Sequence, residues 1–137
     1  MRIAACAFII ALAAFYPPRS SVAQRTTEPA RATETITVHL SNFAFDPAQL
    51  RLKVGVPVRL RLVNESGGGH DFSSPSFFSA NTVLPGGSAP EHGEIAVASH
   101  QTVEMTLLPR TPGTYRLECT HFLHSFFGMH GTIEVTP

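Results

Sequence analysis

The stretch TITVHL, residues 35–40, gives the first indication of the fold, because its polar and apolar side chains alternate. Ile36, Val38 and Leu40 share one face, and the residues between them share the other. Side chains of a β-strand point alternately to its two faces, so this stretch is expected to be a strand that is covered on one side.

The same alternation recurs along the chain after residue 40. It is found in residues 50–54, 58–62, 103–107, 115–119 and 132–135. A further strand is expected around residues 95–97. Proline and glycine turn signals separate these runs, so we predict an all-β fold, a two-sheet antiparallel β-sandwich of about seven or eight strands. Residues 79–93 are long for a loop in such a domain, so they are either a functional loop or the place of a strand without clear alternation.

The composition fits one compact domain. The chain has 137 residues, of which 43% are hydrophobic and 15% are charged. Ten basic residues balance ten acidic ones, so no overall field attracts the chain to nucleic acid or to anionic lipid.

The first residues are typical of a secretory signal. Arg2 precedes an apolar run over residues 3–16, and small residues follow at 21–23. We predict a cleaved signal peptide over residues 1–23, a polar tether over 24–34 and the folded domain over 35–137. An uncleaved membrane anchor is the alternative, but the run is short for spanning a membrane. The protein is therefore expected to be exported, most simply to a periplasm, with no stable membrane insertion after cleavage.

Signal cleavage leaves a single cysteine. Cys6 lies within the predicted signal, so Cys119 alone remains in the exported chain. A lone thiol cannot form an internal disulfide, which favours a reactive or metal-ligating role. A small buried hydrophobic residue is the structural alternative.

The segment CTHFLHSFFGM, residues 119–129, places a thiol, imidazoles and a thioether in one loop. A trigonal set of one Cys and two His with a weak axial Met is the electron-transfer type of copper site. Cys119, His124 and Met129 supply three of these donors. His70 is the natural fourth, because it follows a strand and a glycine-rich bend that can bring it to the same end of the sandwich.

These residues resemble the cupredoxins, the small blue copper proteins. The pattern C-x₄-H-x₄-M matches at Cys119, His124 and Met129, as in auracyanin-like members, and N-x₅-H-D-F matches from Asn64 to Phe72. Residues 43–47 look like the family's first strand and bend. The resemblance covers residues 35–136. It implies a Greek-key sandwich, one type 1 copper ion held by His70, Cys119, His124 and Met129, and an electron carrier that is not an enzyme.

The sequence departs from the family pattern at two points. The spacing from Cys119 to His124 is longer than in plastocyanin-like members. Asp71 stands where azurin-like members have Asn, and a carboxylate facing the sulfur would favour Cu(II) and lower the reduction potential.

Other histidines and methionines have simpler roles. His121 could compete with His124 as a ligand, although the family pattern does not use its position. Met105 is expected in the core, and Met129 and His70 could also be structural. The remaining histidines are expected on the surface, or at most in weak metal sites: His39, His92, His100 and His130.

Phenylalanines crowd the predicted ligand loop. They are Phe122, Phe126 and Phe127, with Phe77 and Phe78 after His70. They either close one end of the sandwich or form an apolar rim near His124 where a redox protein docks on a monomer.

Electron transfer by Cu(II)/Cu(I) cycling is the function that the sequence favours. A copper-binding protein of metal supply or resistance is the first alternative, and an accessory cupredoxin-like domain of a metal-uptake or oxidase system is another. A multicopper enzyme needs several His-x-His pairs, and the sequence has none.

Overall fold

A computed structural model describes residues 34–121 and 127–137. The predicted signal peptide, residues 1–23, lies outside the described residues, as does nearly all of the predicted tether, residues 24–34. Strand β1 begins at Glu34. No helix in the described part of the chain is long and apolar enough to cross a membrane.

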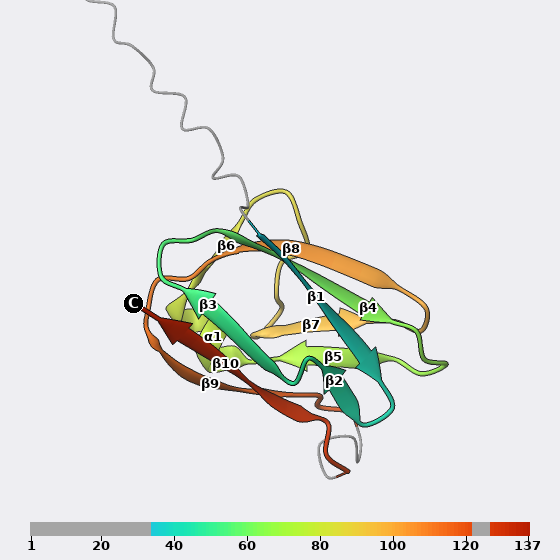
Figure 1. The fold of residues 1–137 in the computed structure, drawn as a ribbon. Coiled ribbons are helices and arrows are strands. Elements are labelled where there is room, and N and C mark those ends of the chain that lie inside the picture. Colours follow the sequence, from blue (N-terminus) through green and yellow to red (C-terminus); the bar gives the residue numbers. More distant parts are fainter. Residues whose placement is uncertain (1–33, 122–126) are drawn as a thin grey trace, which may run out of the picture.

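Two five-stranded sheets pack face to face (Figure 1). The first sheet has the order β2-β1-β4-β8-β6. Its strands are β1 (Glu34–Ser41), β2 (Ala44–Asp46), β4 (Val58–Asn64), β8 (Thr102–Leu108) and β6 (Thr82–Leu84).

The second sheet has the order β3-β10-β9-β5-β7. Its strands are β3 (Gln49–Lys53), β10 (His130–Thr136), β9 (Gly113–Glu118), β5 (His70–Ser73) and β7 (Glu94–Val97). One short helix, α1 (Pro75–Ala80), follows β5.

The predicted β-sandwich is confirmed, with a difference in strand pairing. β1 pairs parallel with β4, and β3 pairs parallel with β10, so both sheets are mixed and not wholly antiparallel. The described residues form ten strands, more than the seven or eight expected, because β2 and β6 are only three residues long and β5 is buried along its whole length, so that no alternation marks it.

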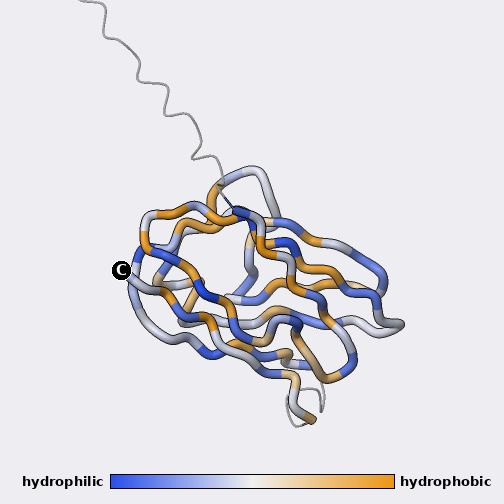
Figure 2. The backbone as a smooth tube through the Cα atoms, in the orientation of Figure 1, coloured by the Kyte–Doolittle hydropathy of each residue, from blue (hydrophilic) through white to orange (hydrophobic). Residues whose placement is uncertain are grey.

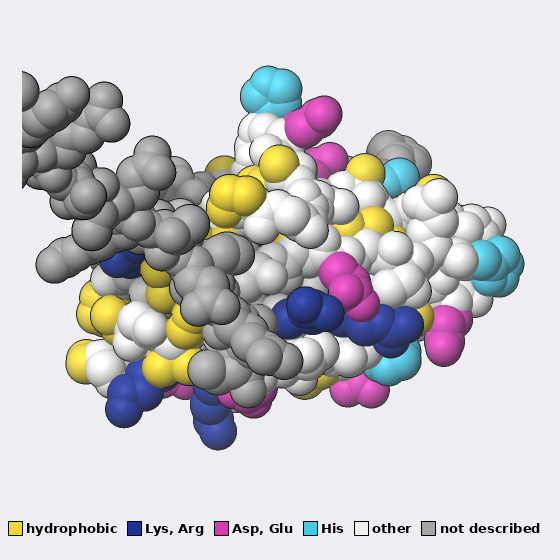
Figure 3. All heavy atoms as spheres, turned by 90° about the horizontal axis from the view of Figure 1, so that it is seen from above, with side chains coloured by type: hydrophobic (Ala, Val, Ile, Leu, Met, Phe, Trp, Pro, Cys, Tyr) yellow, Lys and Arg dark blue, Asp and Glu magenta, His cyan; other side chains and the backbone are white. Residues whose placement is uncertain are grey.

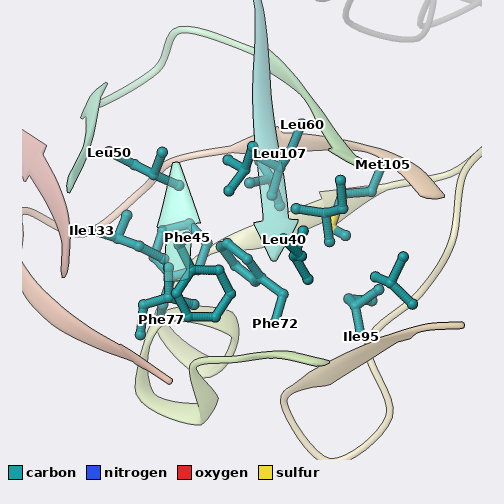
Figure 4. Packing of buried hydrophobic residues seen from close by; sticks show 14 of the residues in the cluster. Leu40, Phe45, Leu50, Leu60, Phe72, Phe77, Ile95, Met105, Leu107 and Ile133 are labelled. Carbon is teal, nitrogen blue, oxygen red and sulfur yellow. The ribbon is translucent and has the colours of Figure 1, made fainter. Parts of the chain in front are cut away.

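The alternation predicted from the sequence is visible in burial. In β3, Leu50 and Leu52 are buried while Gln49, Arg51 and Lys53 are exposed. Figure 2 shows the corresponding change between polar and apolar residues along the strands. The inward side chains meet between the sheets, where Phe72 lies among Phe45 and the surrounding aliphatic residues (Figure 4).

The segment 79–93 contains structure that the sequence did not reveal. Strand β6 pairs with β8 in antiparallel register, with Val83 opposite Leu107, and α1 ends at Ala80. The alternative of a missed strand is therefore the correct one for part of this segment.

Candidate metal centre

The thiol of Cys119 lies at the end of β9 and is completely buried. Cys119 follows the buried residue Leu117 by two positions and therefore points to the same inward face of the sheet. The alternation of the strand thus directs the thiol into the molecule. The backbone N–H of Cys119 donates to the carbonyl oxygen of Met129 at 3.2 Å. The two ends of the predicted ligand loop are therefore held side by side, just where β9 ends and β10 begins (Figure 1).

His70 brings its ring to the same thiol from β5. Its Nδ1 atom lies 3.9 Å from Sγ of Cys119, and the residue is 1% exposed. The approach follows from the pairing of β5 with β9, in which Ser73 lies opposite Glu118. Two residues that are 49 positions apart in sequence thus meet at one end of the second sheet.

Met129 is fully buried and belongs to the same core cluster as Cys119. His124 lies outside the described residues, as do Phe122 and Phe126. The described part of the chain contains no group of three His, Cys, Asp or Glu side chains that could hold a metal ion. The predicted metal centre would use His124 and the Met129 thioether in addition to His70 and Cys119.

The donors that do meet are chemically suited to copper. A thiol and an imidazole, both withdrawn from water and next to a buried Met, are the soft and borderline ligands that copper prefers in redox sites. Oxygen-preferring cations such as Mg²⁺ and Ca²⁺ would find no carboxylate cage in this pair. The described residues therefore fit the proposed metal.

Burial raises the pKa of the Cys119 thiol above its ordinary value, because the thiolate loses hydration. Hydrogen bonds from the backbone N–H groups of Asp71 and His121 lower this pKa, and the charges of Asp71 and Glu94 raise it. The net effect is upward. The thiol is therefore protonated at neutral pH, and the backbone N–H groups of Asp71 and His121 are directed at its sulfur.

Asp71 is 1% exposed and holds the residue that follows Cys119. One carboxylate oxygen accepts the Thr120 backbone N–H at 2.7 Å, and the other accepts the Thr120 hydroxyl at 2.8 Å. These two hydrogen bonds were not predicted from the sequence, which suggested only that the charge of Asp71 would affect the reduction potential. The effect of Asp71 on the reduction potential stays a prediction.

His121 has a partner other than the thiol for its ring. Nε2 of His121 lies 3.7 Å from Oδ2 of Asp71, and the side chain is 48% exposed. Its ring also lies over Gly69, where an added Cβ would be 3.5 Å from Cε1 of His121. The ring is therefore directed at the Asp71 carboxylate near the surface.

The other candidate residues take structural or surface positions. Met105 is 1% exposed and lies in the core. Besides His121, the exposed histidines among the described residues are His39, His92, His100 and His130.

The phenylalanines that the sequence grouped together are divided in the structure. Phe77 is fully buried and contacts Phe78 and Tyr115 edge to face, so it closes one side of the sandwich. Phe127 is 58% exposed. It meets Phe43, which is 44% exposed, with ring centroids 5.3 Å apart. Phe43 was not expected at this surface, because its turn between β1 and β2 is distant from residue 127 in sequence.

The chain matches the family described as cupredoxin-like domain over residues 5–135. No curated protein matches it significantly. Three solved structures show the likeness in fold.

Auracyanin B is 24% identical, with a TM-score of 0.56, and the alignment covers 78% of this chain and 91% of that one. Auracyanin A, a "blue" copper protein from Chloroflexus aurantiacus, is 23% identical, with a TM-score of 0.54 and coverage of 74% and 98%. The multicopper oxidase McoA from Aquifex aeolicus is 17% identical, with a TM-score of 0.59 and coverage of 76% of this chain but only 29% of that one. The family match spans nearly the whole sequence, and this chain therefore belongs to the cupredoxin-like domain family.

Proposed function

We propose that the protein is an exported type 1 copper protein that carries single electrons between redox proteins. The observation that carries this proposal is the buried contact of 3.9 Å between Sγ of Cys119 and Nδ1 of His70, beside the buried Met129. His124 would complete the ligand set. Copper bound there would supply a one-electron Cu(II)/Cu(I) couple.

The chain's own residues prepare the site for rapid electron transfer. His70, Cys119 and Met129 each come from or adjoin a strand of the second sheet, so the donors are held by the sheet and need little movement when the charge of the metal changes. The backbone amides of Asp71 and His121 stabilise the sulfur's negative charge. A site that is preorganised in this way is suited to repeated reduction and oxidation without ligand loss.

Phe43 and Phe127 support a docking role for the surface next to this site. Phe127 lies two residues before Met129, and both rings are substantially exposed. An exposed aromatic pair is a common feature of contact surfaces. The docked partner would exchange one electron with the site and would not be chemically changed otherwise.

The face shown in Figure 3 carries charges of both signs. Arg59 and Arg61 both lie within 4 Å of Glu104, at 3.8 and 3.3 Å, and the face in Figure 3 shows basic and acidic side chains next to one another. A field of one sign, which nucleic acid would require, is not seen on that face.

Redox cycling in the presence of a chelator separates an electron carrier from a copper-supply protein. The copper-loaded protein is reduced with ascorbate and reoxidised with ferricyanide, several times, with the Cu(I) chelator bicinchoninate present. We expect the visible absorption to disappear and return without transfer of copper to the chelator. Release of copper on reduction would instead favour the alternative of metal supply or resistance.

The docking surface has its own test. Electron self-exchange between Cu(I) and Cu(II) forms, measured by NMR line broadening, is expected to slow by about tenfold in Phe127→Ser. Lys53→Ser is the matched control, because Lys53 pairs with Thr136 at the far end of β10. Equal decreases of the self-exchange rate in the two variants would contradict a docking role for Phe127.

A further inference from the structure

The side-chain amide of Asn64 has a fixed orientation at the end of β4. The two hydrogens of its Nδ2 atom are shared among three carbonyl oxygens, those of Gly68 at 2.8 Å, Val97 at 3.0 Å and Ala98 at 3.0 Å. Its Oδ1 atom accepts the backbone N–H of Ser66 at 3.0 Å. Rotating the amide by half a turn would place oxygen against three acceptors, so Oδ1 must face Ser66.

The orientation of Asn64 determines how the Ser66 hydroxyl bonds. This hydroxyl lies 2.7 Å from Oδ1 of Asn64, 3.1 Å from the carbonyl oxygen of Gly68 and 2.9 Å from Nε2 of His70. The two oxygens can only accept, and a hydroxyl has only one hydrogen to donate. The single hydrogen of Ser66 is therefore directed at these oxygens, with the shorter contact to Asn64, and the hydroxyl offers a lone pair to His70.

The lone pair of Ser66 decides which nitrogen of His70 carries the proton. Nε2 must be the N–H donor to Ser66, and in the neutral ring Nδ1 is then left with its lone pair. Nδ1 is the atom that lies 3.9 Å from Sγ of Cys119. The nitrogen that keeps its lone pair is thus the one that faces the thiol.

We infer that Asn64 and Ser66 form a hydrogen-bond relay that sets the tautomer and ring orientation of His70, which makes Ser66 a positioning residue for the copper ligand. The importance of the relay for copper rests on the proposed function, whereas the tautomer itself does not. Partners of this kind orient histidine ligands and make them more basic.

The relay is anchored outside the ligand loop. Asn64 donates to the carbonyl oxygens of Val97 and Ala98 at the end of β7. Asn64 is 1% exposed, so water competes little for these bonds. Among the described residues, the relay to His70 is therefore held by the β4–β5 bend and the end of β7.

The tautomer is measured in metal-free protein by long-range ¹H–¹⁵N correlation spectra of the histidine rings at neutral pH. The parent is expected to show the Nε2–H tautomer for His70, and Ser66→Ala is expected to show a mixture of both tautomers. Ser66→Thr keeps a hydroxyl and should restore the parent pattern. Ser99→Ala is the matched control, because it removes a nearby serine hydroxyl that bonds to the backbone carbonyl of Ser66 and leaves the side chains of Asn64, Ser66 and His70 in place.

Copper affinity, measured by competition with a chelator, is the second measurement. Ser66→Ala should weaken Cu(II) binding about 10- to 100-fold, and Ser99→Ala and Ser66→Thr should change it by less than about threefold. An Nδ1–H tautomer in the parent would overturn the relay even if Ser66→Ala failed to fold. An unchanged tautomer in a folded Ser66→Ala variant, or equal losses of affinity in Ser66→Ala and Ser99→Ala, would overturn it as well. Because the tautomer is measured without copper, a failure of the relay and a failure of copper binding are distinguishable.

Discussion

At the scale of single residues, two methionines are equally buried but differ in their surroundings. Met129 and Met105 are 0% and 1% exposed. Met105 lies in β8 opposite Leu60, whereas the carbonyl of Met129 accepts the backbone N–H of Cys119. Burial therefore does not separate the proposed ligand Met129 from the core residue Met105, whereas the backbone hydrogen bond to Cys119 does.

Leucine substitutions at the two methionines test this distinction. Met129→Leu should retain copper and raise the reduction potential by about 40 mV or more, since losing a weak thioether donor disfavours Cu(II) by roughly 1 kcal/mol. Met105→Leu should leave the potential unchanged and cost less than about 1.5 kcal/mol of unfolding free energy, because the volumes are similar. Protein-film voltammetry and urea denaturation provide the two measurements. Equal shifts of potential in both variants would contradict the axial role of Met129.

The residues that could be predicted are those marked by strand parity or by motif spacing. Cys119 continues the inward parity of Leu117, and the sequence therefore predicted its burial correctly. Asn64 carried a comparable signal, because it continues the inward parity of Leu60 and Leu62 and is a polar residue. Its partner Ser66 carried none, since a serine in a glycine-rich bend is ordinary in sequence. Thr120 also carried no signal in the sequence, because its hydrogen bonds to Asp71 depend on the pairing of β5 with β9.

At the scale of elements, strands with one solvent-exposed face could be predicted from alternating polar and apolar residues, and strands without such a face could not. β5 reads His70–Ser73 and is buried throughout, so no alternation marks it. β6 is half-buried along its three residues. The helix α1 is six residues long, which is too short for a helical period to appear.

The loop between β9 and β10 is the element on which the ligand assignment depends. His124→Ala should abolish or strongly alter the blue absorption, because water would enter the vacated equatorial position. His121→Ala should leave the band near its parent position and intensity, since its ring is directed at Asp71. Copper stoichiometry and visible spectra of both variants provide the measurement. A lost band in His121→Ala together with an intact band in His124→Ala would show that the loop closes two residues after Cys119 and not five.

At the scale of the whole molecule, the sandwich joins distant parts of the chain around one buried thiol. β3 pairs with β10 and β1 pairs with β4, so the two ends of the described chain are fixed in different sheets. The charge is balanced overall, and the inward apolar faces of both sheets form a single core. The thiol is thereby kept away from water at one end of this core.

The buried thiol makes copper binding depend on pH. Because burial raises the pKa of Cys119, the thiol is protonated at neutral pH and must release its proton when copper binds. The affinity for Cu(II) should therefore rise with pH, by about tenfold per pH unit between roughly pH 7 and 8. Competition with a chelator of known affinity at several pH values measures this slope. An affinity that does not change with pH would mean that the thiol is already ionised or is not a ligand.

We propose that Cys119 is the thiolate ligand of a type 1 copper centre, and titration of the purified protein with Cu(II) is the sharpest test of this role. We expect saturation at one copper per chain with an intense blue thiolate-to-copper charge-transfer band. We also expect a colourless but folded Cys119→Ser variant, with circular dichroism confirming the fold. A parent protein that binds Cu(II) without an intense visible band, or a Cys119→Ser variant that remains intensely blue, would contradict it.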